Sequence, residues 1–323
     1  MRQRTLYLFN RTDMPNDLFS DVLQLVGAQS VLAGGFTAGG PWALRFPAPE
    51  KLKFAAMVKG SCWLRVEGDD EVIRVESGDV ALLSTKRAFI LASDLSISPV
   101  DAKAVFSSQG PTFAMLGDGQ DCAQLGGHIA LNATSGDFLA SALPSLIHVR
   151  ASSVHAADLK WLIEKLVREQ TTDKPGSGIA SLQIAQLMFV ELLRAHLAAS
   201  GEFPIGWLRA LGDSRLAPSL RLMHGEPGRE WKLEELAQAC AMSRTTFAVH
   251  FKRSVGTTPL AYLIDWRMRL AERALRESDL PIAAVGQSVG YTSESAFSHA
   301  FKRVIGQAPR NHRSARATEP GTG

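Results

Sequence analysis

The spacing of hydrophobic residues divides the chain into three parts. From Ser30 to about Phe113, short apolar runs are separated by turn-forming glycine, proline and aspartate, which is typical of strands. From Asp137 to about Ala199, apolar residues recur every three or four positions, which is typical of helices. Beyond Leu216 the period remains helical, and one short pattern occurs twice.

The first part predicts a small all-β domain. Apolar and polar residues alternate over Cys62–Glu67, a Gly-Asp-Asp turn follows, and Val72–Val75 continues, which predicts a β-hairpin. Val80–Leu83 and Ala88–Ala92 are expected to form further strands, and Leu18–Val26 a short helix before them. Many short strands at this spacing predict an antiparallel β-barrel or jelly roll.

The second part predicts an α-helical extension over about residues 137–199. Apolar runs at 138–143 and 145–149 lead into a helix over 154–169, and a second helix covers 179–199. The second helix has apolar residues on more than one face: Leu182, Leu187, Val190 and Leu193. Such a helix needs a partner on each side, so we expect it to form the contact of a homodimer. The alternative is that it lies inside the core of its own domain.

The third part contains a repeat with an offset of 50 residues. The first copy reads Phe247-x3-Phe251-Lys252-Arg253-x2-Gly256-x2-Pro259, and the second reads Phe297-x3-Phe301-Lys302-Arg303-x2-Gly306-x2-Pro309. Phenylalanines four residues apart lie on one face of a helix and can be buried together, while Lys-Arg points outward. The glycine then ends the helix. Each copy therefore predicts a helix with a buried face and a basic end.

A shorter helix is expected before each long one, over 233–240 and 282–289. Few residues separate the short helix from the long one, and Ser243 and Ser293 are placed as N-caps of the long helices. This arrangement predicts two helix-turn-helix motifs. Two ordinary helical hairpins are the alternative, which the matched spacing and the basic ends disfavour.

Several short motifs in this part fit a known family of DNA-binding proteins. They are Leu236-Ala237, Met242-Ser243, Phe251-Lys252, Val289-Gly290-Tyr291, Ala300-Phe301-Lys302-Arg303 and Gly306-x2-Pro309. With them, residues 215–316 resemble the DNA-binding domain of the AraC family of bacterial transcriptional regulators. The resemblance covers only the last third of the chain.

The resemblance also implies which residues contact DNA. In the first module, bases would be read at Thr245, Ala248 and Val249, and in the second at Glu294, Ser295, Ser298 and His299. Ala248 and Val249 can contact a thymine methyl but cannot read guanine, so the first module is expected to depend on Arg244, Thr245 and DNA shape. Lys252 and Lys302 are expected to contact phosphate, or simply to solvate the surface. The helix over 258–278 would hold the two modules about 30 Å apart, close to one turn of B-DNA.

Charge separates the last part from the others. Residues 215–316 contain 16 Lys and Arg against 9 Asp and Glu, a net charge of +7, whereas the remaining residues carry 19 against 23, or −4. A basic domain behind a mildly acidic one is typical of a nucleic-acid binder with a separate module.

Three runs in the first part, Gly40–Phe46, Gly60–Leu64 and Gly78–Val80, resemble the cupin-like sensory domain that is often fused to this family. Aromatic residues would line its interior at Trp42, Phe46, Trp63 and Phe89, either as core or as the wall of a small-molecule site. A metal-binding cupin needs clustered histidines, and none occurs between Met1 and Gly127. We therefore expect no metal and no cofactor, with His128, His148 and His155 as surface or structural histidines.

The cysteines and the hydropathy indicate the compartment. Cys62, Cys122 and Cys240 are an odd number at wide spacing, which favours neither a disulfide framework nor a zinc cluster. The first residues are too short in their apolar part for a signal peptide, and no apolar run reaches the length of a transmembrane helix. A cytoplasmic location without membrane contact is expected.

Together these features predict an α+β protein of two domains: a cupin-like effector-sensing β-barrel with its helical extension over 1–200, a linker over 201–214, an all-α double helix-turn-helix domain over 215–316, and a disordered tail over 317–323. The predicted function is transcription regulation, as an activator or a repressor, with double-stranded DNA, a small-molecule effector, RNA polymerase and a second copy of the chain as partners. The alternatives are a cupin-type enzyme or a cysteine-dependent DNA-repair transferase with a DNA-binding tether, and a constitutive architectural protein. No catalytic residues are predicted.

Overall fold

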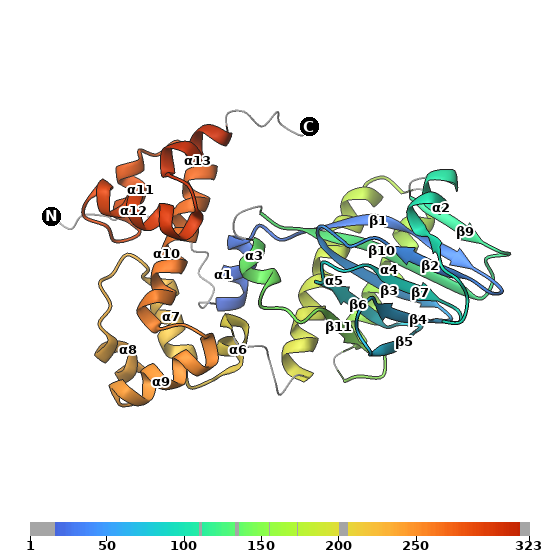
Figure 1. Cartoon of the computed structure of the whole chain (residues 1–323), viewed down its shortest axis with the longest axis horizontal. Coiled ribbons are helices and arrows are strands. Elements are labelled where there is room, and N and C mark those ends of the chain that lie inside the picture. The colour runs from blue at the N-terminus through green and yellow to red at the C-terminus, as the bar shows by residue number, and fades with distance from the viewer. Residues whose placement is uncertain are drawn as a thin grey trace. The chain divides into compact units, whose positions relative to one another are not determined.

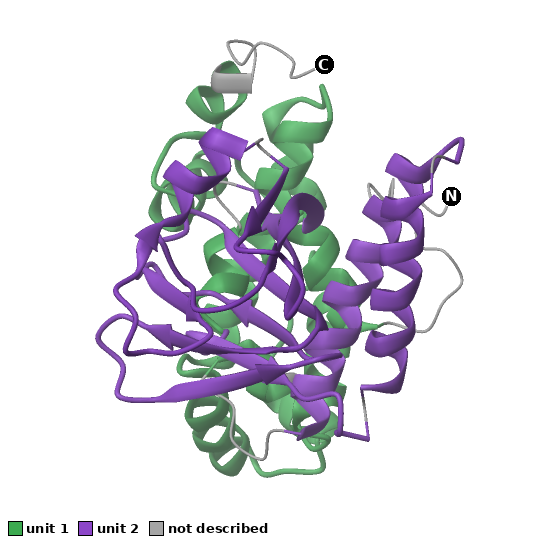
Figure 2. Ribbon diagram, turned by 90° about the vertical axis from the view of Figure 1, so that its right-hand side faces the viewer, with its two compact units in different colours: residues 1–27, 133–142, 203–323 green, residues 28–132, 143–202 purple. Residues whose placement is uncertain are grey.

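The computed structural model describes residues 17–109, 112–132, 136–154, 156–172, 174–199 and 206–316. They form two compact units, each built from separate stretches of the chain (Figure 2). The sandwich unit comprises Ala28–Asn132 and Leu143–Glu202, and the helical unit comprises Met1–Gly27, Ala133–Ala142 and Phe203–Gly323.

The strands of the sandwich unit form two sheets (Figure 1). Their bounds are β1 Gln29–Ala38, β2 Ala43–Phe46, β3 Leu52–Lys59, β4 Ser61–Val66, β5 Val72–Glu76, β6 Val80–Leu83, β7 Phe89–Ala92, β8 Val100–Asp101, β9 Phe113–Leu116, β10 Cys122–Ala130 and β11 Leu146–Val149. One sheet has the order β11-β6-β3-β10-β1-β9 and the other β5-β4-β7-β2-β8. Neighbours are antiparallel, except that β9 is parallel to β1 and β8 to β2. The predicted hairpin is confirmed by β4 and β5, which pair Arg65 with Val72.

The core of this unit lies between the sheets. Alternate side chains of β4, namely Cys62, Leu64 and Val66, are buried there, as the period of two along a strand requires. They belong to one cluster with Phe36 of β1 and Met57 of β3 from the other sheet. The alternation read from the sequence thus marks the inner face correctly.

Of the two architectures predicted for this unit, a barrel or a jelly roll, the described strands have the two-sheet arrangement of a jelly roll and form a sandwich with separate edges, not a closed barrel. One sheet ends in β5 and β8, and the other in β11 and β9. Closure would need hydrogen bonds between edge strands, whereas β8 is only 2 residues long. Alternation along a sequence identifies the face of a strand that is buried, but it does not show which edges are joined.

Among its described residues, the sandwich unit has three helices: α2 Ala102–Gln109, α4 Ala157–Thr171 and α5 Ser177–Ala199. The helices expected over 154–169 and 179–199 are confirmed as α4 and α5, which pack on each other and on β1, β3 and β11. Helical structure over 145–149 is wrong, since Leu146 pairs with Leu83 as part of β11. The sequence also gave no sign of α2.

Helix α5 is long and apolar enough, by length and composition alone, to cross a membrane. Its contacts are those of a core helix: Ile184, Met188 and Leu192 are buried, and Gln186 accepts a hydrogen bond from the Ser30 N–H at 2.8 Å. These contacts to β1 account for one of its apolar faces.

The helical unit contains two helix-turn-helix motifs, α8–α9 and α11–α12, joined by α10 (Figure 1). Its helices are α1 Leu18–Leu25, α3 Gly136–Ala140, α6 Trp207–Gly212, α7 Ala217–Gly225, α8 Leu233–Ala239, α9 Arg244–Val255, α10 Pro259–Glu277, α11 Ile282–Ser288, α12 Glu294–Ile305 and α13 Pro309–Arg316. The segment expected to be a linker, 201–214, includes helix α6, whose Trp207 is buried.

The two units interleave in sequence, whereas the predicted division cuts the chain once. Helix α1 packs on α7 and α10, and α3 also belongs to the helical unit, although both helices lie in the first half of the chain. The tail expected over 317–323 lies outside the described residues.

Candidate functional site

The two copies of the repeat have the same capping geometry. Ser243 and Ser293 accept hydrogen bonds from Thr246 N and Ala296 N, both at 3.2 Å, and so cap α9 and α12 as predicted. At the other end, Gly256 and Gly306 have φ of 85° and 87°, in the left-handed region that ends a helix. The sequence pattern therefore fixes where both long helices begin and end.

The buried faces of α9 and α12 also match. The rings of Phe247 and Phe251 are 5.7 Å apart between centroids, and those of Phe297 and Phe301 are 5.6 Å apart. All four side chains are buried. A Cβ added to Gly286 of α11 would lie 3.0 Å from the ring of Phe297, so this small residue allows the close crossing of the two helices. Burial of one face leaves the opposite face of each helix open to solvent.

The residues predicted to contact DNA lie on those open faces. Arg244, Thr245, Val249, Lys252, Glu294, Ser295, His299 and Lys302 are exposed, and Ala248 and Ser298 are half-buried. Val249 has 63% of its surface exposed, although it is aliphatic. Each helix thus presents one stripe that combines small, polar and basic side chains.

Two of these residues have charged neighbours. The Arg244 guanidinium lies 2.8 Å from a carboxylate oxygen of Glu234, and Glu294 lies 3.7 Å from Arg310. Such exposed ion pairs contribute about 0–1 kcal/mol. Arg244 can therefore exchange its partner for a DNA phosphate at little cost.

Helix α10 sets the spacing between the two motifs. Its 19 residues correspond to about 28 Å at 1.5 Å per residue. Its arginines are engaged inside the unit: Arg269 pairs with Asp265 at 2.8 Å, and Arg267 donates to the carbonyls of Pro227 and Arg229. Because these arginines of α10 are paired within the unit, the exposed candidate residues are those of α9 and α12.

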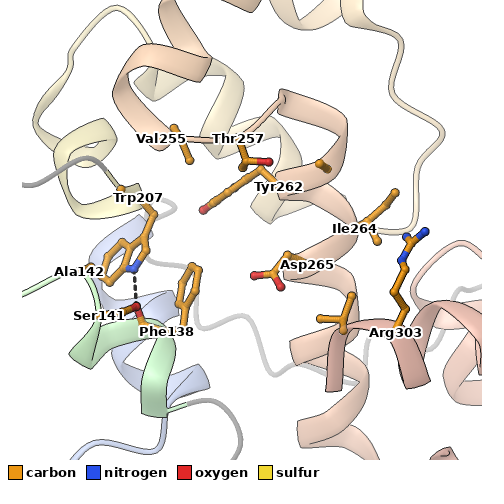
Figure 3. Close-up of a pocket in the computed structure, with 13 residues that line it drawn as sticks. Phe138, Ser141, Ala142, Trp207, Val255, Thr257, Tyr262, Ile264, Asp265 and Arg303 are labelled. Carbon is orange, nitrogen blue, oxygen red and sulfur yellow. Dashed lines mark hydrogen bonds between the residues drawn. The ribbon is translucent and has the colours of Figure 1, made fainter. Parts of the chain in front are cut away.

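A cavity of about 750 Å³ lies inside the helical unit, between α3, α6, α10 and the end of α12 (Figure 3). Phe138 of α3 stacks on Trp207 with 5.2 Å between ring centroids, and the indole Nε1 donates to the Phe138 carbonyl at 2.8 Å. The Arg269 guanidinium lies 4.6 Å from the centroid of the same Phe138 ring. These contacts hold α3, which follows β10 and precedes β11 in the sequence, against α6 and α10.

A second cavity, of about 290 Å³, lies inside the sandwich unit. Residues from β1, β2, β3, β6, β7 and β10 line it together with α2, among them Phe46, Leu83, Phe89, Leu91, Phe106, Lys53 and Gln124. Phe46 and Phe89 stack with 4.8 Å between ring centroids. The walls are mainly apolar, with few polar groups, which is typical of a small-molecule site.

The four aromatic residues predicted to bind an effector separate into two pairs. Phe46 and Phe89 line the sandwich cavity. Trp42 is buried in the core against Phe36, and Trp63 points to the other face of β4, where its ring lies 5.7 Å from the Arg74 guanidinium carbon. Side chains alternate along a strand, and the neighbours Cys62 and Leu64 face inward, so Trp63 faces outward. Effector binding by any of the four stays a prediction.

The cysteines lack the environment of a nucleophile. Cys62, Cys122 and Cys240 are all buried. Burial raises the pKa of the Cys122 thiol to about 11 and raises the pKa of the Cys62 thiol further. A cysteine-dependent transferase needs an accessible thiolate, so this geometry disfavours that alternative.

The described ranges contain no group of three or more His, Cys, Asp or Glu side chains that could hold a metal ion. His148 lies 2.8 Å from Asp79, whose carboxylate also accepts from the backbone of Glu76 and Ala151. Burial favours the protonated form of Asp79, but these hydrogen bonds outweigh it and lower its pKa. His148 is thus a structural histidine, His128 is half-buried on β10, and His155 lies outside the described residues.

The sequence interpretation missed the polar groups of the sandwich cavity. Lys53 occurs in phase with the inward-facing Ala55 and Met57 of β3, and Gln124 in phase with the inward-facing Cys122 of β10. The period of two along a strand could have identified both residues, because it places a charged or amide side chain on the inward-facing side. It also missed the contact of Phe138 with Trp207, because these residues are distant in sequence.

Two family models match the chain. Residues 17–198 match a model described as a cupin, and residues 236–315 match a model described as a helix-turn-helix domain. The first covers the sandwich unit as far as residue 198 together with α1 and α3 of the helical unit, and the second covers most of α8 and all of α9, α11 and α12.

Several known proteins are similar to the chain. An AraC-like transcription regulator of Streptomyces antibioticus is 41% identical over 297 residues, which cover 92% of this chain and 98% of that protein. The HTH-type transcriptional regulator AlkR of Acinetobacter baylyi is 31% identical over 85% of this chain and 91% of its own length. Among solved structures, the DNA-binding domain of AdpA in complex with a target DNA is 33% identical, covers 34% of this chain and 98% of that chain, and gives a TM-score of 0.32.

Proposed function

The chain belongs to the AraC-like family of transcription regulators, and from this premise we propose that it recognises specific duplex DNA through α9 and α12 under the control of a small molecule bound in the sandwich cavity. The observation that carries the proposal is the matched pair of exposed stripes on two identically capped helices. Helix α10 separates the two motifs by about the length of one DNA turn, which suits successive major grooves.

The proposed roles of the exposed residues follow from their chemistry. Thr245, Ser295, Ser298 and His299 carry donors and acceptors that can read base edges, while Ala248 and Val249 can contact thymine methyl groups. Lys252 and Lys302 have no carboxylate partner within 4 Å among the described residues and are proposed to contact phosphate. Arg244 and Glu294 are the first residues of α9 and α12, and both are exposed beside these positions.

Effector control requires a path from the cavity to the DNA-binding helices. We propose that α3 supplies it, since Phe138 is held on Trp207 and Arg269 while the chain on both sides of α3 continues into β10 and β11. In this proposal the protein is a cytoplasmic homodimer without enzymatic activity. RNA polymerase is the further partner of such a regulator.

Selection of duplex DNA from a random pool by the full-length chain tests this function. We expect enrichment of sites with two half-sites about 10 base pairs apart. The same selection is done with the double variant Thr245→Glu, Ser295→Glu, which places a negative charge on each exposed stripe without altering a buried residue. This variant should not enrich the sites. An unenriched pool with the wild type, or equal enrichment with the variant, contradicts the proposal.

A further inference from the structure

Two polar side chains of the sandwich cavity that are buried or half-buried have no polar partner within the part of the chain that the structure describes. They are the ammonium of Lys53 on β3 and the carboxamide of Gln124 on β10, which both line the cavity. A polar group that is removed from water costs free energy unless it has a hydrogen-bond or ion-pair partner. A ligand that supplies a partner to both Lys53 and Gln124 would therefore be bound specifically.

The Lys53 ammonium faces an aromatic ring and not a carboxylate. Its Nζ lies 5.3 Å from the centroid of Phe46, which itself stacks on Phe89. Burial lowers the pKa of Lys53, and no acidic group offsets that effect. The cavity wall therefore has a positive charge at one position and apolar rings beside it.

Gln124 is buried, with 7% of its surface exposed, and it is one of the residues that line the cavity. In the ladder of β10 and β3, Gln124 lies opposite Met57 and Gly126 opposite Ala55. Lys53 is four residues from Met57 along β3, which corresponds to about 13 Å. Between the two polar groups the wall includes the small residues Ala55 and Gly126, so the body of a small ligand has room there.

We propose that the sandwich cavity binds a compact carboxylic acid with an apolar, planar or short aliphatic body, whose carboxylate pairs with Lys53 and whose opposite end carries a group that hydrogen-bonds to Gln124. This inference rests on the proposed effector function of the same cavity and names the chemical class of the effector.

The cavity disfavours the other classes of ligand. A cation would be placed beside Lys53, and a sugar would leave most of its hydroxyls unpaired against Phe46, Phe89 and Phe106. A volume of about 290 Å³ lies at the lower end of the range for small-molecule sites, which excludes large ligands. Lys103 of α2 also lines the cavity, but it is exposed to solvent, where an ion pair contributes little.

The test is calorimetric titration of the full-length protein with matched small molecules. Each set shares one body, phenyl, cyclohexyl or hexyl, and ends in a carboxylate, a primary amide or an amine; each acid is also tested with a hydroxyl at the far end. For at least one body we expect the carboxylate to bind about tenfold or more tightly than its amide. Lys53→Met should reduce that ratio to about twofold or less, and Gln124→Leu should remove the advantage of the hydroxyl.

Lys59→Met is the control, because Lys59 lies on the same strand β3 and the variant has the same charge change outside the cavity lining. Carboxylates and amides binding equally well, or a preference that survives Lys53→Met, overturns the assignment. Loss of the preference in Lys103→Met but not in Lys53→Met overturns it as well. If no body binds in any charge form while specific DNA binding is intact, this inference fails and the effector role of the cavity fails with it, whereas the DNA-binding function stands.

Discussion

Ala241 and Gly290 occupy corresponding positions in the turns of the two helix-turn-helix motifs. Both have positive φ, 52° for Ala241 and 89° for Gly290. The residue after each closes the turn with the same bond, from Met242 N to Ala237 O and from Tyr291 N to Gly286 O, both at 3.0 Å. An alanine in the left-handed region is strained by about 1–2 kcal/mol, whereas glycine is not.

The surroundings of Ala241 and Gly290 differ, so exchanging alanine and glycine at the two positions should change the free energy of unfolding in opposite directions. Ala241→Gly should raise the free energy of unfolding by about 0.5–1 kcal/mol, because relief of strain exceeds the added entropy of the unfolded chain. Gly290→Ala should lower it by at least about 2 kcal/mol, because the new Cβ would lie 2.5 Å from the carbonyl oxygen of Gly228. Urea denaturation of both full-length variants measures the two changes. A destabilising Ala241→Gly would show that this turn does not hold its residue in the left-handed region.

His224 gives the helical unit a dependence on pH. The imidazole is buried, stacks on Trp266 at 3.7 Å between centroids, and lies 2.8 Å from the Tyr262 hydroxyl. Burial lowers its pKa below the ordinary 6.5, although nearby Asp21 acts in the opposite direction. The unfolded chain therefore binds the proton more readily, so this contribution to stability is complete above pH 6.5 and is lost as pH falls through 6.5 towards the folded pKa.

The variant His224→Gln can keep a hydrogen bond to Tyr262 but cannot titrate. We expect the unfolding free energy of the wild type to decline between pH 7 and 5 by up to about 1.4 kcal/mol per pH unit more steeply than that of the variant. Urea denaturation followed by tryptophan fluorescence at several pH values measures both slopes. Parallel slopes in the two proteins would contradict the role of His224.

At the scale of elements, local signals decided what the sequence could predict. Helices α9 and α12 were predicted with their ends because serine caps, paired phenylalanines and terminal glycines all lie within each element. Strand β11 was missed because its apolar run, Leu146–Val149, is compatible with either structure, and only pairing with β6 decides. The open edges of the two sheets likewise depend on contacts between distant segments, so the sandwich could not be told from a barrel.

The same limit applies to the candidate site. The stripes of α9 and α12 were predicted by family resemblance and lie exposed on one face of each helix, whereas only Phe46 and Phe89 of the four predicted aromatic residues line the sandwich cavity. The parity of Trp63 relative to its strand neighbours could have shown that it points away from the inner face of β4. The position of Trp42 behind Phe36 depends on packing between the sheets and has no signal in the sequence.

Reading and positioning residues on α12 should be separable by mutation. His299→Ala should relax the preference at one half of the selected site, with a loss of about 1–3 kcal/mol on the preferred sequence only. Lys302→Ala should weaken binding to all sequences alike and reduce the slope of log affinity against log salt by about 0.9. Titration of the preferred and an altered site at several salt concentrations distinguishes the two outcomes. Equal losses for both variants on every sequence would show that the division of roles is wrong.

At the scale of the whole molecule, the apolar residues of α5 that remain exposed bear on assembly. Of the four residues predicted to drive dimerisation, Leu193 is buried and Val190 half-buried, whereas Leu182 and Leu187 expose 43% and 44% of their surface. Ile179 is 72% exposed on the same helix, and Trp161 of α4 is 55% exposed. The inner face of α5 thus belongs to the core of its own unit, and a dimer contact on this helix would involve its outer face.

Ile179, Gln183 and Leu187 are spaced four residues apart and therefore lie along one face of α5. Exposed apolar side chains grouped in this way favour association, since burial of each contributes on the order of 2 kcal/mol. Two copies joined there would present four helix-turn-helix motifs, which increases specificity for repeated half-sites. We expect the wild type to sediment as a dimer at micromolar concentration, and the variant Ile179→Glu, Leu187→Glu to sediment as a folded monomer. Gln183→Glu, which adds charge to the same face at a position that is already polar, should remain dimeric; a monomeric wild type, or a dimeric double variant, rejects α5 as the interface.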